Sequence, residues 1–171
     1  MYKNTILVCY FLQHVLGQEG LLVTTSQGLV RGLTSDDGDY HMYLGIPYGL
    51  VDKDNPFGHS SPHPPFEGIF DAVDDSAICP QVEEFNSTVV GSLDCLHLSV
   101  FVPNNSDNAP KAVLVWTYGG RFEIGFYGRF LFGPKFLVRH NIILVTINYR
   151  LGPYGFMCTD NPRVPGNQGL K

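Results

Sequence analysis

Residues 112–147 read AVLVWTYGGRFEIGFYGRFLFGPKFLVRHNIILVTI and contain two nearly continuous apolar runs, at 112–116 and 142–147. Both runs are rich in β-branched residues, as expected of parallel strands covered on both faces of a sheet. Between them, residues 133–140 predict a short helix that Asn141 can end. A strand, a helix and a second parallel strand form a βαβ unit with a right-handed crossover. The stretch therefore predicts an α/β fold.

The chain before this unit predicts antiparallel strands that lead into the parallel sheet. Residues 21–26 and 28–33 read as a pair of short strands, and 40–44 alternate. Residues 51–68 are rich in proline and glycine, which leaves little room for regular structure. Residues 95–102 predict an antiparallel strand that is half-buried through one face. That face carries Leu96, Leu98, Val100 and Val102.

The first seventeen residues have the pattern of a secretory signal peptide. Lys3 is their only charged residue, and a mostly apolar stretch ends at Leu16. Val15 and Gly17 supply small residues at −3 and −1 of a cleavage site. The alternative is an N-terminal strand or a short buried helix. The first interpretation predicts a secreted, extracellular protein whose mature part begins at residue 18. No stretch of these 171 residues is long enough to span a bilayer, and they leave open whether the protein has a membrane tether.

Cysteines and glycosylation signals fit an oxidising compartment. Cys79, Cys95 and Cys158 follow the predicted signal, which favours one disulfide and one leftover thiol. A bridge between Cys79 and Cys95 would close a polar loop and stabilise the fold by roughly 3 kcal/mol. Cys158 would then be buried, or would pair outside the chain. Asn86 and Asn104 begin two acceptor tripeptides for N-glycosylation in predicted loops.

The charge of the chain argues against nucleic acid as a partner. The net charge is −5, and there is no run of lysines and arginines that could track a phosphate backbone.

The loop after the first buried strand, Tyr118 to Phe122, contains a glycine pair. Such a pair lets backbone N–H groups approach a ligand, and they can stabilise an oxyanion. Taken alone, the pair is more typical of an ordinary tight turn.

Seven motifs in a fixed order change that interpretation. Together they resemble the type-B carboxylesterase/cholinesterase family, in particular its secreted insect-type members, from about residue 20 to Lys171. The motifs are GIPY at 45–48, DA at 71–72, CPQ at 79–81, DCLHL at 94–98, VWTYGG at 115–120, VTINYRLG at 145–152 and PGNQGLK at 165–171.

The resemblance implies an α/β-hydrolase fold and the hydrolysis of small-molecule carboxylic esters by a Ser, Glu (or Asp) and His triad. It implies no cofactor and no metal. It maps a disulfide onto Cys79 and Cys95, and an oxyanion hole onto Gly119, Gly120 and Arg121. Residues 18–171 would be the N-terminal portion of the family's domain.

The sequence departs from the family pattern at the residues that would carry out catalysis. No G-x-S-x-G nucleophile elbow occurs in it, so no catalytic residue of the triad is present and the triad is expected beyond Lys171. Arg121 stands where relatives have a third glycine. If the loop needs a positive φ there, Arg121 brings strain or flips the peptide, and its side chain can block the acyl pocket.

Two further departures concern an ion pair and a binding loop. Pro56 and Leu93 replace the arginine and glutamate that form a salt bridge in relatives, and losing both leaves no orphaned charge. The loop between Cys79 and Cys95 lacks the tryptophan that binds choline in cholinesterases. A choline ester is therefore not the expected substrate, and Trp116 is expected in the core.

Three hypotheses follow. The first is an ester hydrolase of which these 171 residues are the front part, inactive alone. The second is a non-catalytic adhesion or binding member of the same fold, of the neuroligin or glutactin type, which Arg121 favours. The third is a stand-alone fragment with another role. If no further strand follows, residues 112–116 leave a bare apolar sheet edge, which predicts aggregation.

Overall fold

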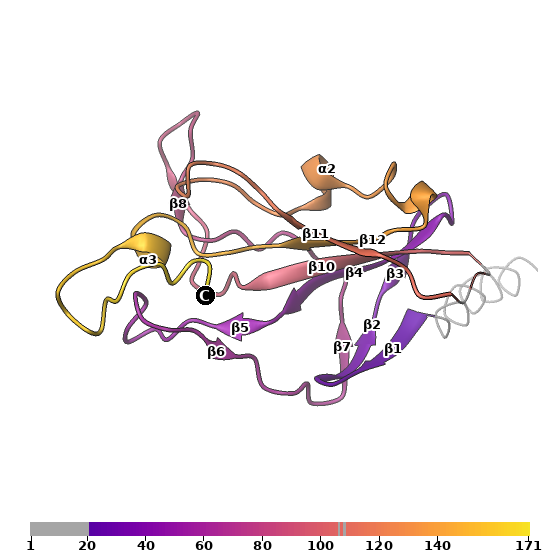
Figure 1. Ribbon diagram of the computed structural model, residues 1–171, viewed down its shortest axis with the longest axis horizontal. Coiled ribbons are helices and arrows are strands. Elements are labelled where there is room, and N and C mark those ends of the chain that lie inside the picture. Colours follow the sequence, from indigo (N-terminus) through magenta and orange to yellow (C-terminus); the bar gives the residue numbers. More distant parts are fainter. Residues whose placement is uncertain (1–20, 106, 108) are drawn as a thin grey trace, which may run out of the picture.

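The computed structural model describes residues 21–105, 107 and 109–171, so the predicted signal peptide at 1–17 lies outside the described residues. A five-stranded sheet forms the centre (Figure 1). β11 and β12 are parallel, and every other neighbouring pair in this sheet is antiparallel. In sheet order its strands are β11 (Val113–Thr117), β12 (Ile143–Ile147), β10 (His97–Pro103), β4 (Tyr40–Pro47) and β3 (Leu33–Thr34).

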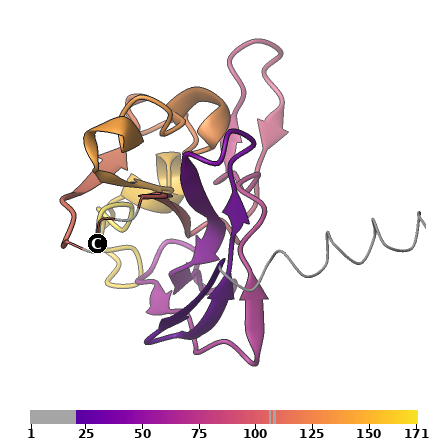
Figure 2. The ribbon, with the colours of Figure 1, turned by 90° about the vertical axis from the view of Figure 1, so that its right-hand side faces the viewer.

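Shorter elements surround this sheet. A three-stranded sheet contains β1 (Leu22–Thr25), β2 (Gly28–Arg31) and β7 (Ile69–Asp71). Two-stranded pairs are formed by β5 (Gly49–Leu50) with β6 (Ser61–Pro62), and by β8 (Gln81–Val82) with β9 (Val89–Val90). The β8–β9 hairpin stands out from the body of the molecule in two views that differ by a quarter turn (Figures 1 and 2). The described helices are α2 (Arg129–Phe132), the 3-10 helix η2 (Val138–His140) and α3 (Gly152–Phe156).

The predicted βαβ unit is present, but its helix is not the one expected. β11 and β12 pair in parallel from Val113 opposite Ile143 to Thr117 opposite Ile147. Of residues 133–140 only the last three are helical, as η2, and Phe136 before them is 75% exposed. Asn141 ends η2 in the left-handed conformation, as predicted. The connection also contains α2, which the sequence analysis did not identify.

β10 pairs on both sides and is buried more deeply than predicted. It lies between β12 and β4, antiparallel to each. The expected face, with Leu98, Val100 and Val102, is half-buried. Ser99 and Phe101 on the opposite face are fully buried. Core side chains pack on both faces of β10, with Phe101 in one cluster and Val100 and Val102 against another, so the alternation identifies the strand but underestimates its burial.

β11 is an edge strand, and the prediction that it is covered on both faces is wrong for the described residues. Val113, Leu114, Val115 and Trp116 are 40% to 58% exposed. The described strands pair with β11 on one edge only, through β12. Trp116 contacts Phe132 of α2 with ring centroids 5.7 Å apart, but it is not a core residue. Among the described strands one edge of β11 is unpaired, and the aggregation expected from it stays a prediction.

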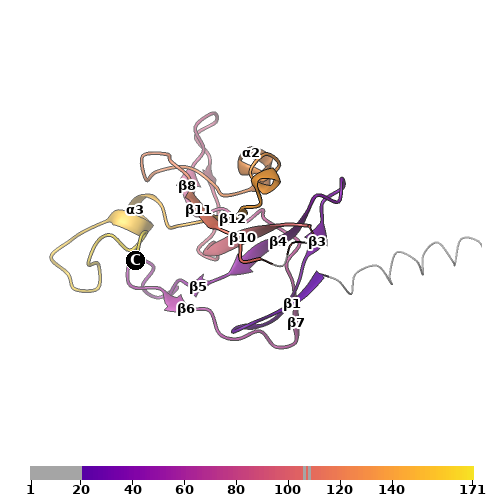
Figure 3. The same cartoon turned by 45° about the vertical axis from the view of Figure 1, so that its right-hand side comes forward.

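The core next to the β8–β9 hairpin is built around a disulfide. Cys79 and Cys95 are bonded and fully buried, as the resemblance implied. The same cluster contains the tyrosines that follow β11 and β12, Tyr118 and Tyr149. The disulfide and the segments that follow β11 and β12 therefore share one core cluster, and the segment after β12 leads into α3 (Figure 3). The free Cys158 is exposed rather than buried.

Candidate active site

Two tyrosines fix the chain at the point where β11 and β12 end. The Tyr149 hydroxyl donates to the Tyr118 carbonyl at 2.9 Å, and the Tyr118 hydroxyl donates to the Tyr149 carbonyl at 3.4 Å. Their rings stack with centroids 4.7 Å apart. Burial raises the pKa of both phenols, so both stay protonated and able to donate at neutral pH. The contacts with Tyr149 therefore fix the position of Tyr118, the residue before the loop that begins at Gly119.

Residues 119–125 form a compact turn closed by its own backbone. The Gly120 carbonyl accepts hydrogen bonds from the N–H groups of Glu123 at 3.0 Å and Ile124 at 3.1 Å. Gly120 has a φ of 152°, and a Cβ there would overlap the Ile124 carbonyl oxygen. Only glycine adopts this conformation without strain. The turn thus requires glycine at 120 for both space and backbone geometry.

The three residues predicted to form an oxyanion hole retain free donors. Among the described residues, the N–H groups of Gly119, Gly120 and Arg121 donate to no acceptor. Arg121 has a φ of 58°, the positive value that the sequence analysis identified as a source of strain. Phe122 follows with a φ of 62°. Consecutive N–H groups in a turn of this kind can bind an anion or a developing oxyanion.

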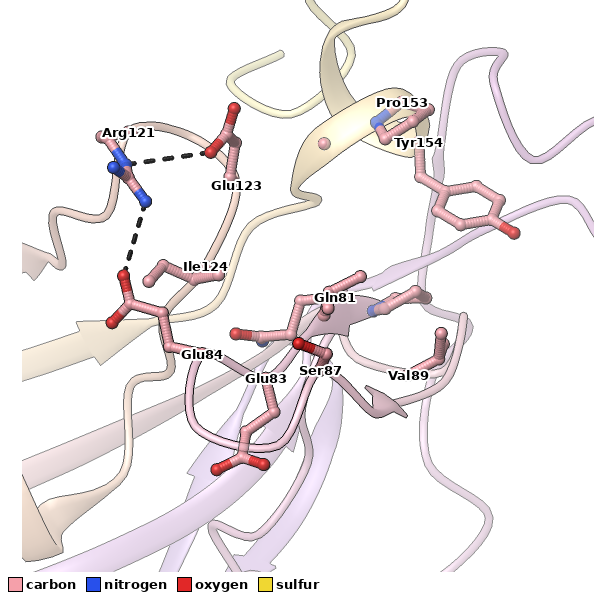
Figure 4. Close-up of a pocket in the computed structure, with 13 residues that line it drawn as sticks. Gln81, Glu83, Glu84, Ser87, Val89, Arg121, Glu123, Ile124, Pro153 and Tyr154 are labelled. Carbon is pink, nitrogen blue, oxygen red and sulfur yellow. Dashed lines mark hydrogen bonds and ion pairs between the residues drawn. The ribbon is translucent and has the colours of Figure 1, made fainter.

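The Arg121 side chain points to the rim of a cavity rather than into the protein (Figure 4). It is 72% exposed, and its guanidinium lies 3.4 Å from the Glu84 carboxylate and 3.8 Å from the Glu123 carboxylate. The cavity measures about 430 Å³, and neither Gly119 nor Gly120 lines it. Its lining comes from the disulfide loop (Pro80, Gln81, Val82, Glu83, Glu84, Ser87, Val89), the turn (Arg121, Glu123, Ile124) and α3 (Gly152, Pro153, Tyr154).

Gln81, which the sequence analysis quoted only as part of a motif, bonds directly to the turn. Its Oε1 accepts from the Gly125 N–H at 2.8 Å, and its Nε2 donates to the Gly125 carbonyl at 2.8 Å. The same nitrogen donates to the Cys79 carbonyl at 3.1 Å. The position of Gln81 two residues after a disulfide cysteine was the available signal, but the sequence does not show which segment its amide meets.

Arg150 is a second residue whose role the sequence did not reveal. Its side chain is buried and donates to the carbonyls of Pro56 at 3.0 Å, Gly58 at 2.8 Å and Gln168 at 2.7 Å. Burial lowers its pKa from the usual value for arginine. Its contacts are with backbone dipoles instead of a carboxylate. Arg150 joins the segment after β12 to two loops that are distant in the sequence.

The two glycosylation candidates are both at the surface. Asn86 lies in the turn of the β8–β9 hairpin, where its Oδ1 accepts from the N–H of Thr88 at 2.9 Å and from its hydroxyl at 2.6 Å. Asn104 is exposed, and its Nδ2 donates to the Gly38 carbonyl at 3.0 Å. The side-chain nitrogen that would carry a glycan is thus already engaged at Asn104. Ser106, the last residue of that tripeptide, lies outside the described residues.

Metal and membrane features were searched for among the described residues. Within residues 21–105, 107 and 109–171, no group of three or more histidine, cysteine, aspartate or glutamate side chains is placed to hold a metal ion. In the same part of the chain, no helix has the length and apolar character needed to cross a bilayer.

Comparison with known proteins identifies a single family along nearly the whole chain. The profile described as "Carboxylesterase family" matches residues 19–171. Human bile salt-activated lipase is 33% identical over 87% of this chain and 21% of its own length. Esterase B1 of Culex pipiens is 34% identical over 90% of this chain and 29% of its own length. Para-nitrobenzyl esterase of Bacillus subtilis is 38% identical over 80% of this chain and 29% of its own length. The chain spans about a fifth to three tenths of these relatives.

Proposed function

Because the chain belongs to the carboxylesterase family, whose fold is the α/β-hydrolase, we propose that the protein carrying it hydrolyses small-molecule carboxylic esters. The observation that carries the proposal is the turn after β11. Its N–H groups at Gly119, Gly120 and Arg121 are free, and its geometry is fixed by the Tyr118–Tyr149 pair. Such donors stabilise the negative oxygen of a tetrahedral intermediate more than they stabilise the substrate carbonyl.

These residues supply electrostatic stabilisation, and the nucleophile has to come from elsewhere. A serine hydroxyl needs an adjacent base to attack an ester, and the 171 residues contain no G-x-S-x-G elbow to present one. Residues 1–171 alone are therefore expected to hydrolyse a p-nitrophenyl ester no faster than buffer does. Saturable turnover by the isolated chain would contradict this assignment of roles.

The test uses the product of the complete transcript that carries this sequence. Hydrolysis of p-nitrophenyl butyrate and covalent labelling by a fluorophosphonate, which reacts with activated serines, are measured side by side. The proposal expects saturable hydrolysis that disappears in proportion to labelling. A folded protein that neither turns over the ester nor takes the label would refute it.

The second candidate is a non-catalytic binding protein on the same fold, and Arg121 is the observation that favours it. A non-glycine residue at φ 58° is strained, and its charged side chain stands at the rim of the cavity. Replacing it by glycine separates the two candidates. If Arg121 slows an esterase, Arg121→Gly should hydrolyse the ester faster than the wild-type protein does. A binding protein without a triad should be inactive both as wild type and as Arg121→Gly.

We propose that the protein is secreted and carries N-linked glycans at Asn86 and Asn104. The signal-like residues 1–17, the buried disulfide and the exposure of both asparagines support this. Expression in a eukaryotic secretory host, followed by glycosidase treatment, tests it. Two separable mass shifts in the medium fraction are expected, with one shift lost in Asn86→Gln and one in Asn104→Gln. Retention of the protein in the cells with its N-terminus uncleaved would refute secretion.

A further inference from the structure

The side-chain amide of Gln81 pairs with one backbone residue as a neighbouring strand would. It accepts from the N–H of Gly125 and donates to the carbonyl of the same residue, each at 2.8 Å. A side chain that meets both polar groups of one peptide residue fixes the direction of that backbone as well as its position. The side chain of Gln81 is also bonded to the disulfide loop, because its Nε2 donates to the Cys79 carbonyl and Cys79 is in the buried disulfide. Gln81 thus links the disulfide loop to Gly125, and the two hydrogen bonds between Gln81 and Gly125 are called the clamp below.

Gly125 is the last residue of the turn and lies against Tyr118, the residue before the turn begins. It has a φ of 137°, and a Cβ there would overlap the ring of Tyr118. The backbone at Gly125 therefore lies directly against the residue that precedes Gly119. Between these two positions, Gly120 accepts from Glu123 and Ile124 across the turn. Holding Gly125 consequently closes a small ring of backbone that contains all three free N–H groups.

The other link between the disulfide loop and the turn is much weaker. Arg121 reaches Glu84 at 3.4 Å, with both side chains more than 60% exposed. Exposed ion pairs contribute little, because water competes for both charges. The Gln81 amide is half-buried, and its hydrogen bonds are shorter. Gln81 is therefore the contact that can set the geometry of the turn.

We propose that Gln81 is a positioning residue for the oxyanion-binding turn, holding Gly125 so that the N–H groups of Gly119, Gly120 and Arg121 converge. The inference rests on the proposed ester hydrolysis. Oxyanion donors act only within about 2.7–3.1 Å of the developing charge, and a displacement of about 1 Å can cost about 100-fold in rate. Loss of the clamp would thus affect the transition state while leaving the binding of substrate largely intact.

The test compares Gln81→Met with Ser92→Ala in the complete protein. Methionine keeps the length of the side chain but makes neither hydrogen bond to Gly125. Ser92 is a matched control, because its hydroxyl bonds to the Asp94 carbonyl within the same disulfide loop and has no contact with the turn. Gln81→Glu is a second variant, in case methionine impairs folding. Its carboxylate still accepts from the Gly125 N–H but cannot donate to the carbonyl.

Two kinetic measurements separate positioning from general damage to the fold. One is kcat and KM for p-nitrophenyl butyrate, and the other is inhibition by a trifluoromethyl ketone, whose serine adduct carries an oxyanion. Gln81→Met should lower kcat about 10- to 100-fold with KM changed less than about twofold, and should weaken the inhibitor by the same factor as kcat/KM. Ser92→Ala should change each quantity less than about twofold. Equal losses in both variants, or lost turnover with unchanged inhibition, would overturn the proposal.

A third measurement keeps failure of this proposal distinct from failure of the proposed function. Hydrogen exchange of the peptide covering residues 119–125 reports the order of the turn whether or not the protein is an enzyme. Exchange at least about tenfold faster in Gln81→Met than in Ser92→Ala supports the clamp. Equal exchange overturns it. Wild-type protein without turnover and without inhibitor binding, but with the exchange difference, would refute ester hydrolysis and leave the clamp standing.

Discussion

Replacing Gly120 by alanine tests whether the turn after β11 has to keep the backbone it shows. A Cβ at 120 would overlap the Ile124 carbonyl oxygen, and the φ of 152° is accessible to glycine alone. The backbone must shift to relieve the overlap, and the accompanying strain predicts a destabilisation of about 1–3 kcal/mol. The shift also moves the N–H groups of residues 119–121. Loss of one oxyanion donor lowers kcat about 100- to 1,000-fold, and we expect a loss in that range for the complete protein.

Gly119→Ala is the matched control for stability, since the two glycines are adjacent and differ in their surroundings, and the wild-type protein is the reference for turnover. A Cβ at Gly119 meets no atom within 4 Å, and its φ is not positive. We expect its free energy of unfolding to stay equal or to rise by about 0.4–1 kcal/mol, because alanine restricts the unfolded chain. Chemical unfolding monitored by circular dichroism and hydrolysis of p-nitrophenyl butyrate measure the two effects. Equal stability in the two variants, or wild-type turnover in Gly120→Ala, would refute the argument from the turn geometry.

Three further predictions concern the frame of the site, each read from chemical or thermal unfolding of the complete protein. Arg150→Met removes the donor to three carbonyls and should lower stability by roughly 3–5 kcal/mol, whereas a change below 1 kcal/mol would show that water replaces the guanidinium. The double variant Cys79→Ser with Cys95→Ser should lose about 3 kcal/mol, and no loss would mean the reduced loop keeps its structure. Burial lowers the pKa of His97 in the folded state, so the folded protein binds its proton less readily than the unfolded chain does. Stability present above about pH 6.5 should fall as the pH drops below that value, and His97→Gln should flatten the slope; an unchanged slope would contradict the assignment.

The sequence predicted the elements whose signal is local, and it failed where burial depends on neighbours. The parallel pairing of 112–116 with 142–147 followed from two apolar, β-branched runs. The exposure of Trp116 did not follow, because an apolar run looks the same in a central strand and an edge strand. The helix expected over residues 133–140 is limited to Val138–His140, and Phe136 before it is exposed.

The candidate site divides in the same way between local and long-range features. The loop of Gly119, Gly120 and Arg121 was singled out by the family resemblance, because the glycine pair alone is typical of an ordinary turn. Gln81 was missed because its partner, Gly125, lies 44 residues away. A glutamine amide can donate and accept in almost any direction, so its type alone does not reveal what it contacts. Such contacts become visible only when the backbone has been placed.

The conformation of Arg121 bears on whether this substitution silences the site. The sequence left two ways in which Arg121 could abolish activity: a flipped peptide that removes the donor, or a side chain that blocks the acyl pocket. In the structure the N–H of Arg121 has no acceptor among the described residues, and its guanidinium lies beside Glu84 and Glu123 at the rim of the cavity. The strain of a positive φ, about 1–2 kcal/mol for a non-glycine residue, falls on stability. The Arg121 N–H therefore stays available despite this strain, and the comparison of turnover between the wild-type protein and Arg121→Gly is what decides between the hydrolase and the binding protein.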